Sequence, residues 1–293
     1  MSIFKKATKE KLKLKIALQG ASGSGKTYSA LRLAHGIESN WEKIFYIDTE
    51  NKSATYYSEQ FEFQHHDMQP PYHPEKFIEI IDAAIAAGAS VIIIDSLSAE
   101  WEGEGGCLDL ADKVSKSMRN PNTFTAWKDI TPRHNKFIDH LRLSPVHIIA
   151  CSRSKQEYSI EKGSDGKNKV VKLGMKEVQR DNVSYEFGIV FEIDGDHMAY
   201  AGKDRTGLYA DKPRHQITEE TGKELLRWAN SGKEEIYIGT NQQKIAMAKI
   251  CRDEHAIDDK KMMAEISEAL IKQGIAFSAL ENSIANYIAE RTI

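Results

Sequence analysis

Residues 20–27 read GASGSGKT and match the whole phosphate-binding pattern GxxxxGK[ST]. An alternating, strand-like run precedes them at 12–18, and a helical run follows at 28–35. In such a loop, glycines let backbone N–H groups surround a β-phosphate at a helix N-terminus. The lysine reaches the β- and γ-oxygens, and the threonine hydroxyl holds Mg²⁺. The pattern therefore predicts that ATP and Mg²⁺ bind at Gly20, Ser22, Gly23, Ser24, Gly25, Lys26 and Thr27.

The composition is that of an ordinary globular protein. The 293 residues are 41% hydrophobic and 28% charged, with a net charge of -3, so any binding of nucleic acid must rest on local patches. No apolar run approaches the roughly 20 residues of a membrane span. The cysteines, Cys107, Cys151 and Cys251, are odd in number and lack metal-type spacing. We expect reduced thiols in a cytoplasmic protein that has no membrane partner.

Strand-like and helical segments alternate along the chain. Strands are predicted at 43–48, 91–95, 146–151, 187–194 and 197–201, and helices at 74–87, 125–143 and 218–230. The run 91–95 (VIIID) has almost no polar residue, as expected where helices cover both faces of a parallel sheet. The expected fold is α/β, with a mainly parallel twisted sheet flanked by helices. The expected parts are a basic arm at 1–12, a core at 13–232, a linker at 233–239 and a helical domain at 240–293.

Two carboxylates are candidates for the chemistry. Asp95 ends a buried strand about 70 residues after the phosphate loop, where it would hold Mg²⁺ through water close to Thr27. Asp95 is followed by Ser96 and not by a glutamate, so the base must come from elsewhere. Glu50 follows the strand 43–48. Carboxyl ends of parallel strands line one crevice, so Glu50 would lie beside the loop and deprotonate the attacking water. The alternative is a surface glutamate at a strand end.

The words GASGSGKT, YIDTE and VIIIDS, in this order, resemble the RecA/Rad51 family of strand-exchange ATPases over roughly residues 13–230. The stretches SLSAEWEGEGG and AWKDITPRHNKF resemble phage-encoded RecA-like proteins, including those assigned to single-strand annealing. The resemblance implies a RecA-like core, Glu50 as the base and Tyr57 stacked on adenine. It places the γ-phosphate sensor at Ser152, but the family often has glutamine there, and Arg153 is an equal candidate.

Lys203 and Arg205 form a K-x-R element after the strand 197–201. Residues i and i+2 of an extended segment point to the same side, which suits two cations that clamp one triphosphate. The resemblance implies that they reach a triphosphate held by the adjacent subunit, so that the protein self-associates with ATP at its interfaces. An exposed turn is the alternative.

Two long loops, 100–122 and 155–184, stand where RecA-like proteins place their DNA loops. Lysines there would neutralise phosphates and tyrosines would stack on bases. The second loop has a net charge near +2, and a solvated hairpin that turns at 164–166 explains it almost as well. Its DNA-binding candidates are Lys155, Lys162, Lys167, Lys169, Lys172 and Arg180.

The two ends of the chain suggest protein contacts. Residues 4–7 (FKKA) fit the F-x-x-A pattern with which Rad51-like proteins dock on a neighbour, although a lysine-rich run is usually just solvated. Residues 240–293 have seven basic and eight acidic residues, so they form no electrostatic DNA tail. Their expected partner is a single-strand-binding protein or another replication or recombination protein.

These features predict a DNA-stimulated, Mg²⁺-dependent ATPase of RecA type. The resemblance to phage-encoded proteins implies that it binds single-stranded DNA as an oligomer or filament and supports phage-type recombination or annealing in a bacterial host cell. The alternatives are a nucleotide-gated adaptor, such as a helicase loader with little turnover, and a P-loop kinase. A kinase would need a phosphoacceptor pocket and an arginine lid. We also expect the Lys26 side chain to face solvent in the nucleotide-free protein.

Overall fold

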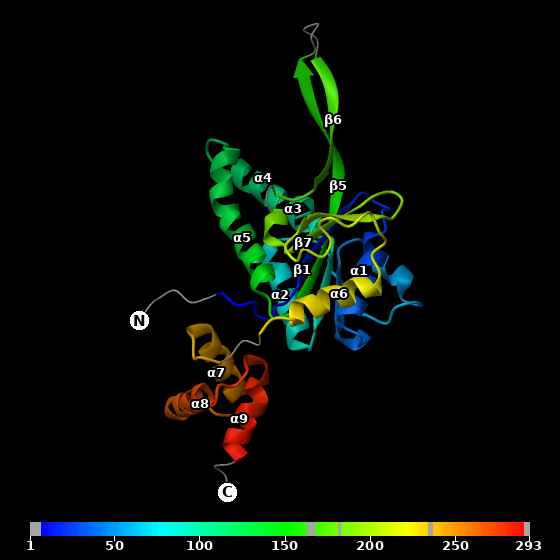
Figure 1. Ribbon diagram of the computed structural model, residues 1–293. Coiled ribbons are helices and arrows are strands. Elements are labelled where there is room, and N and C mark those ends of the chain that lie inside the picture. The colour runs from blue at the N-terminus through cyan, green and yellow to red at the C-terminus, as the bar shows by residue number, and fades with distance from the viewer. Residues whose placement is uncertain (1–6, 163–167, 181–182, 234–236, 290–293) are drawn as a thin grey trace. The chain divides into compact units, whose positions relative to one another are not determined.

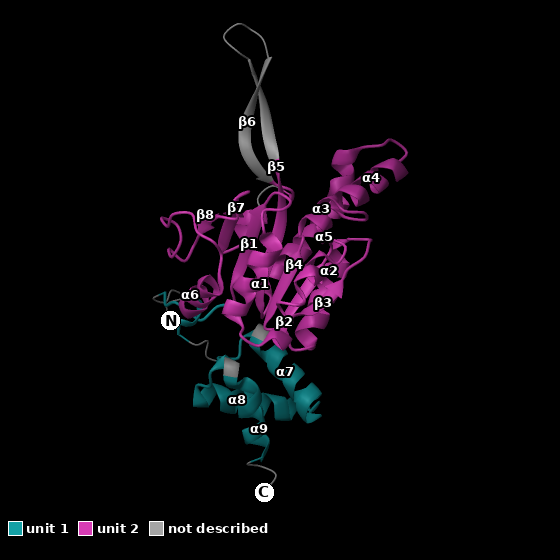
Figure 2. Ribbon diagram, turned by 90° about the vertical axis from the view of Figure 1, so that its right-hand side faces the viewer, with its two compact units in different colours: residues 1–12, 229–293 teal, residues 13–228 magenta. Residues whose placement is uncertain are grey.

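The structure of the protein is a computed structural model that describes residues 7–162, 168–180, 183–233 and 237–289, without the side chains of residues 156–176, 241, 242 and 278. It divides into two compact units, residues 13–228 and residues 1–12 together with 229–293 (Figure 2). No helix among the described residues is long and apolar enough to cross a membrane.

The larger unit is built on one twisted sheet. Its strands are β1 Lys15–Gly20, β2 Ile44–Asp48, β3 Gln64–Asp67, β4 Val91–Asp95, β5 His147–Lys162, β6 Asn168–Glu177, β7 Ile189–Ile193 and β8 Ala199–Asp204. The strand order is β3-β2-β4-β5-β1-β7-β8, with β6 paired only to β5. All pairs from β3 to β7 along this order are parallel, while β8 is antiparallel to β7 and β6 to β5. The prediction of a mainly parallel α/β sheet is confirmed.

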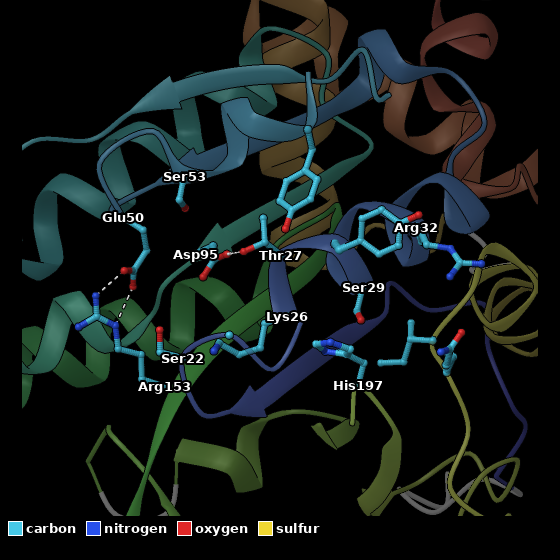
Figure 3. Close-up of a pocket in the computed structure, with 16 residues that line it drawn as sticks. Ser22, Lys26, Thr27, Ser29, Arg32, Glu50, Ser53, Asp95, Arg153 and His197 are labelled. Carbon is cyan, nitrogen blue, oxygen red and sulfur yellow. Dashed lines mark hydrogen bonds and ion pairs between the residues drawn. The ribbon is translucent and has the colours of Figure 1, made fainter. Parts of the chain in front are cut away.

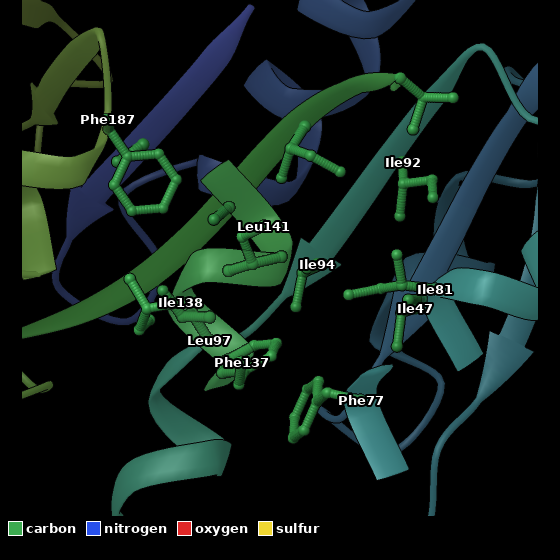
Figure 4. Packing of buried hydrophobic residues seen from close by; sticks show 14 of the residues in the cluster. Ile47, Phe77, Ile81, Ile92, Ile94, Leu97, Phe137, Ile138, Leu141 and Phe187 are labelled. Carbon is green, nitrogen blue, oxygen red and sulfur yellow. The ribbon is translucent and has the colours of Figure 1, made fainter. Parts of the chain in front are cut away.

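Helices cover both faces of this sheet (Figure 1). They are α1 Lys26–Ile37, α2 Pro74–Ala86, α3 Ser98–Glu102, α4 Cys107–Ser117, α5 Thr123–Leu143 and α6 Glu219–Asn230. The apolar faces of α2 and α5 bury the residues of the main core against the sheet (Figure 4). Phe77 and Phe137 meet there with ring centroids 5.3 Å apart. The β-branched run of β4 is fully buried, as its sequence predicts.

The helix α1 packs on β1, β4 and β5 and carries the phosphate loop at its N-terminus. On its outer side, α1 meets α6 at two glycines. A Cβ on Gly36 would lie 2.0 Å from the carbonyl oxygen of Glu219, and one on Gly222 would lie 2.3 Å from that of Leu33. The two backbones touch, so neither position has room for a side chain.

The segment 100–122 is not the long loop that the sequence suggested. The helices α3 and α4 occupy most of it, and α4 packs against α5. Glycines at 103, 105 and 106 favoured a loop, but they only separate α3 from α4. Two of its lysines are paired within α4 to aspartates four residues earlier, Lys113 with Asp109 and Lys116 with Asp112. This neutralises much of the positive charge that suggested DNA contact.

The segment 155–184 is largely a β-hairpin and not an irregular loop. The end of β5 pairs antiparallel with β6 from Ser154 opposite Glu177 to Lys162 opposite Asn168. This agrees with the alternative interpretation as a hairpin, whose expected turn at 164–166 lies outside the described residues.

The smaller unit has its own hydrophobic core. The helices α7 Asn241–His255, α8 Lys260–Gln273 and α9 Leu280–Ala289 surround Tyr237, Met247, Cys251, Ile266, Leu270 and Ile284. The methionines of this unit that are buried, Met247 and Met263, serve its core. In the same unit, Lys11 donates its backbone N–H to the carbonyl of Lys233 at 2.8 Å, and Lys233 donates to Lys9 at 2.7 Å. The F-x-x-A residues 4–6 lie outside the described part of the chain.

Candidate nucleotide site

The phosphate loop connects the end of β1 to the start of α1. Gly23 and Gly25 have φ of 80° and 88°, in the left-handed region that favours glycine, and these two positions turn the chain into the helix. Ser24 is buried, and its Oγ has no hydrogen-bond partner among the described residues. A buried hydroxyl without a partner is unusual in a folded protein. This loop therefore offers an unused donor next to backbone N–H groups at a helix N-terminus, as a bound phosphate requires.

The Lys26 side chain is buried, so the expectation that it faces solvent is wrong. Only 9% of the residue is exposed. Its Nζ donates to the carbonyl oxygens of Gly20 and Ala21, at 3.0 and 2.8 Å. The loop curls around the amine and supplies acceptors from its own backbone, which sequence reasoning did not anticipate. The amine is thus held inside the loop, where a phosphate oxygen can replace a carbonyl as its partner.

Thr27 and Asp95 lie together although they are far apart in sequence. The Thr27 hydroxyl donates to Asp95 Oδ2 at 2.6 Å (Figure 3). The Tyr46 hydroxyl donates to the same oxygen, also at 2.6 Å. Burial raises the pKa of the Asp95 carboxyl, although both hydrogen bonds act in the opposite direction. A hydroxyl and a carboxylate at a phosphate site are oxygen ligands of the kind that Mg²⁺ prefers. These two residues fit the expected metal.

Glu50 lies in the same cavity, and it does not stand alone. Arg153 forms a bidentate ion pair with it, in which Nε donates to Oε1 at 2.8 Å and a terminal nitrogen donates to Oε2 (Figure 3). The Ser96 hydroxyl also donates to Oε1, at 2.9 Å. Burial raises the pKa of the Glu50 carboxyl, but hydrogen bonding and charge from Arg153, aided by Ser96, outweigh it and leave the pKa below its ordinary value. Both carboxylate oxygens are therefore engaged.

Asp48 fixes the chain around Glu50, a role that sequence reasoning missed. The Asp48 side chain is fully buried at the end of β2 and accepts from the backbone N–H of Glu50 at 2.7 Å and of Ala54 at 3.0 Å. His65 Nε2 lies 3.2 Å from its second oxygen. An aspartate that ends a buried strand, just before a turn, is the signal that could have revealed it.

The cavity extends from the phosphate loop to an aromatic end and has a volume of about 520 Å³. Tyr57, in the short helix Ser53–Tyr57, lines this end together with Tyr28, and their ring centroids are 5.7 Å apart. The further lining residues that were not predicted include Arg32, His197, Gln216 and Ile217. His197 has a φ of 63°, and its Nδ1 lies 3.0 Å from the carbonyl oxygen of Ser24. Its turn, DGDH, is the only feature of the sequence that could have drawn attention to it.

Ser152 and Arg153 occupy different environments because successive residues of a strand point to opposite faces. Ser152 is fully buried and does not line the cavity. Arg153 lines the cavity together with Lys26 and Glu50. Of the two sensor candidates, Arg153 is thus the one that lies in the cavity of the phosphate loop.

Lys203 and Arg205 lie away from the phosphate loop of their own chain. Lys203 is paired with Val190 on β7, whereas the loop begins where Gly20 is paired with Ile193. The Lys203 Nζ donates to the carbonyl oxygens of Ser184 and Tyr185, at 3.2 and 2.6 Å. A terminal nitrogen of Arg205 donates to the same Tyr185 oxygen at 3.2 Å. The two cations thus point to one side, as their spacing predicts, and neither lines the cavity.

The DNA-binding candidates are only partly described. Lys155 is exposed at the start of the hairpin, and Arg180 is half-buried after it. By backbone register, Lys169 lies opposite Glu161, Lys172 opposite Tyr158 and Lys162 opposite Asn168. The side chains of Lys162, Lys169 and Lys172, and all of Lys167, lie outside the described part of the structure.

Within the described residues, one group of metal-type side chains lies together: Glu100, Cys107 and His134, all buried. The Cys107 thiol donates to Glu100 Oε1 at 3.0 Å, and His134 Nδ1 lies 3.0 Å from the same oxygen. Gln179 Nε2 donates to Glu100 Oε2 at 3.3 Å and to the Leu97 carbonyl at 3.1 Å. A structural zinc ion needs four ligands, and the amide nitrogen supplies none. We interpret the group as a hydrogen-bonded network that ties α3, α4 and α5 to the base of the hairpin.

One family model and one solved structure relate this chain to known proteins. No curated protein matches the sequence significantly. Among solved structures, the chain is similar to a KaiC-like protein from the hyperthermophilic archaeon Pyrococcus horikoshii OT3. The identity is 15% and the TM-score 0.39, and the match covers 68% of this chain and 82% of that one. A family model described as an AAA domain matches residues 12–221, more than half of the 293 residues. The chain therefore belongs to the AAA domain family.

Proposed function

We propose that the chain is a Mg²⁺-dependent ATP hydrolase of RecA type that works on single-stranded DNA as an oligomer. The observation that carries this proposal is the contact between Thr27 and Asp95, inside a cavity that also holds Lys26 and Glu50. Thr27 and Asp95 are the candidate metal ligands, and the other two residues are a phosphate-binding cation and a carboxylate. Hydrolysis of a triphosphate requires these three kinds of group.

Each group has a definite task in this proposal. Lys26 exchanges its loop carbonyls for β- and γ-phosphate oxygens. Thr27 and Asp95 hold Mg²⁺, which neutralises charge on the phosphates. Glu50 accepts the proton of the attacking water, and Tyr57 packs on adenine at the aromatic end of the cavity. Catalysis of phosphoryl transfer rests mostly on such positioning and charge stabilisation.

The proposed site is completed by a second copy of the chain. Lys203 and Arg205 carry positive charge on a side of the sheet that their own loop does not reach. They would stabilise the γ-phosphoryl group of a neighbour's ATP, as an arginine finger supplied in trans does. Self-association would then be a condition of hydrolysis.

The hairpin of β5 and β6 is the proposed contact with single-stranded DNA. Its backbone ladder is regular apart from one irregularity after Glu157, and lysines lie on both strands. Lysines attract phosphates without regard to sequence, which suits annealing or recombination of the phage type inside a bacterial host. The unit with α7, α8 and α9 would bind a single-strand-binding protein or another replication or recombination protein.

One observation favours a second candidate function. In this structure the proposed base is occupied by Arg153 on both oxygens. A protein that stayed in this state after binding ATP would turn over slowly and act as a nucleotide-gated adaptor, such as a helicase loader. Both candidates use every phosphate-binding residue, so only turnover separates them.

The test is phosphate release measured with Mg²⁺, with and without single-stranded DNA, at several protein concentrations. The proposed function predicts release that requires Mg²⁺, rises with DNA and increases per subunit with concentration. ATP binding without release would support the adaptor instead.

A paired set of variants tests the hairpin. Replacing Lys155, Lys169 and Lys172 together by alanine should weaken DNA binding. In a plot of the logarithm of the binding constant against the logarithm of the salt concentration, the slope should also become less steep by roughly 0.7 for each phosphate that is no longer neutralised. The matched control replaces Lys113 and Lys116, which are already paired to aspartates. Equally weakened binding in both variants would contradict a specific role of the hairpin.

A further inference from the structure

The ion pair between Glu50 and Arg153 weakens Glu50 as a base. A carboxylate that deprotonates water needs a free lone pair directed at that water. Arg153 Nε and the Ser96 hydroxyl both donate to Oε1, and a terminal nitrogen of Arg153 donates to Oε2, so three of about four lone-pair sites are engaged. The adjacent positive charge also makes the carboxylate a poorer proton acceptor. Departure of Arg153 would therefore free lone pairs on both oxygens and restore the basicity of Glu50.

Arg153 can leave because only its main chain is fixed. Its N–H donates to the Ser98 hydroxyl at 3.0 Å, and its carbonyl accepts from Val178 at 2.7 Å. The side chain, in contrast, is about half exposed, at 49%, and that of Glu50 is 25% exposed. Solvent around the half-exposed guanidinium screens the ion pair, so an anion of higher charge nearby can compete for the guanidinium.

The stronger anion would arrive in the same cavity. Arg153 is the register partner of Gly20, the first residue of the phosphate loop. It lines the cavity together with Lys26 and Glu50. A γ-phosphate placed by Lys26 would lie near the guanidinium, which binds phosphate oxygens in the same bidentate manner as a carboxylate. A diphosphate lacks that group and would leave the ion pair intact.

We propose that the Arg153 side chain has two positions. In the free and ADP-bound protein it pairs with Glu50, and when ATP binds it moves to the γ-phosphate. The transfer frees Glu50 at the moment when a hydrolysable phosphate is in place. When the Arg153 side chain moves, Glu50 becomes free to act as the base, and the guanidinium binds the γ-phosphate. This inference rests on the proposed function, since it takes Glu50 as the base.

The fixed main chain of Arg153 belongs to β5 and is continuous with the hairpin. Val178, the partner of its carbonyl, follows directly after β6, and β5 continues from Arg153 into the hairpin ladder. Gln179, next in the chain, bonds to the Leu97 carbonyl and to Glu100. The two strands of the hairpin are therefore tied at their base to the segment that follows Asp95.

Two measurements test the proposal, and neither needs hydrolysis. The first compares the affinities for Mg·ADP and for the non-hydrolysable triphosphate Mg·AMP-PNP. Arg153→Ala should lower the affinity for the triphosphate about tenfold and change that for ADP by less than about twofold. Arg153→Lys should recover part of the triphosphate affinity, because it keeps the charge and not the fork. The matched control is Arg142→Ala, an arginine of similar exposure, 47%, outside the cavity. An equal decrease for both nucleotides, or none, would overturn the proposal.

The second measurement follows the clamp itself in the wild-type protein. The NMR signal of the Arg153 Nε–H, identified by its disappearance in Arg153→Lys, should be the same in the free and Mg·ADP states. It should move when Mg·AMP-PNP binds, and Glu50→Gln should move it in the free protein. One unchanged signal in all three states would show a static anchor and overturn the proposal. Nucleotide binding without hydrolysis would contradict only the proposed function, and no binding at all would contradict both.

Discussion

A mixture of two inactive variants tests whether Arg205 acts across a subunit interface. Glu50→Gln removes the proposed base and keeps the arginine, while Arg205→Ala does the reverse. Ile16 of β1 pairs with Ile189 of β7, which pairs with Asp204 of β8, the residue before Arg205. The phosphate loop begins at Gly20, four residues after Ile16 in β1. Four residues of a strand span about 13 Å, so Arg205 does not reach the phosphate loop of its own chain. Each variant alone should therefore bind ATP and release phosphate slowly.

The expected gain follows from the number of complete interfaces. A site is complete when one subunit supplies an intact Glu50 and its neighbour an intact Arg205. If the variants mix at random in equal amounts, each condition holds at half of the interfaces, so about a quarter of the sites are complete in a head-to-tail assembly. Phosphate release should rise to about a quarter of the wild-type rate per subunit, and less at unequal ratios.

The matched control mixes Glu50→Gln with Lys26→Ala. Both residues belong to the same side of the interface, so no arrangement of these variants gives a complete site. Phosphate release is measured across a series of mixing ratios, with co-assembly checked by light scattering. A flat response for Glu50→Gln with Arg205→Ala, despite co-assembly, would refute the trans arrangement. A gain equal to that of the control pair would refute it as well.

Three further predictions concern the site and the core. Lys26→Ala should abolish tight nucleotide binding and lower the free energy of unfolding by about 1–3 kcal/mol, because the loop carbonyls of Gly20 and Ala21 lose their charged donor; nucleotide titration and urea unfolding check this. The pKa of Glu75 is lowered to about 2, chiefly by its hydrogen bonds to Arg133. The stability from this ion pair is therefore present above the ordinary value of 4.5 and disappears as the pH falls toward 2. Unfolding measured over that range should depend less on pH in Glu75→Gln. Phe137→Ala should cost about 3–5 kcal/mol of stability, because the ring is fully buried against Phe77. In contrast, Phe124→Ala on the same helix, where the ring is 89% exposed, should cost under about 0.5 kcal/mol.

The parts of the site that the sequence predicted share one property: their position follows from local pattern and from sheet topology. A glycine-rich loop between strand and helix placed Lys26 and Thr27. A buried strand that ends in Asp95 placed the second oxygen ligand, and Glu50 followed from the rule that parallel strands end at one edge. These residues do lie in one cavity.

The parts that were missed depend on interactions between distant segments. No local sequence pattern predicts the ion pair between Arg153 and Glu50, since the two residues are 103 positions apart. The same holds for His197 over the phosphate loop, 173 positions from Ser24. The burial of Lys26 was missed because the phosphate loop provides acceptors of its own, which a motif does not reveal. The helix α4 was missed because the glycines before it resemble those of a loop.

The central claim is that the cavity hydrolyses Mg·ATP with Glu50 as the base. The most direct measurement compares single-turnover phosphate release and ATP affinity in the wild type and in Glu50→Gln, both with Mg²⁺ and single-stranded DNA. We predict similar ATP affinity in the two proteins and phosphate release slower by about 10²–10⁴-fold in the variant, because the amide cannot accept the proton. Release at the wild-type rate in Glu50→Gln would contradict it.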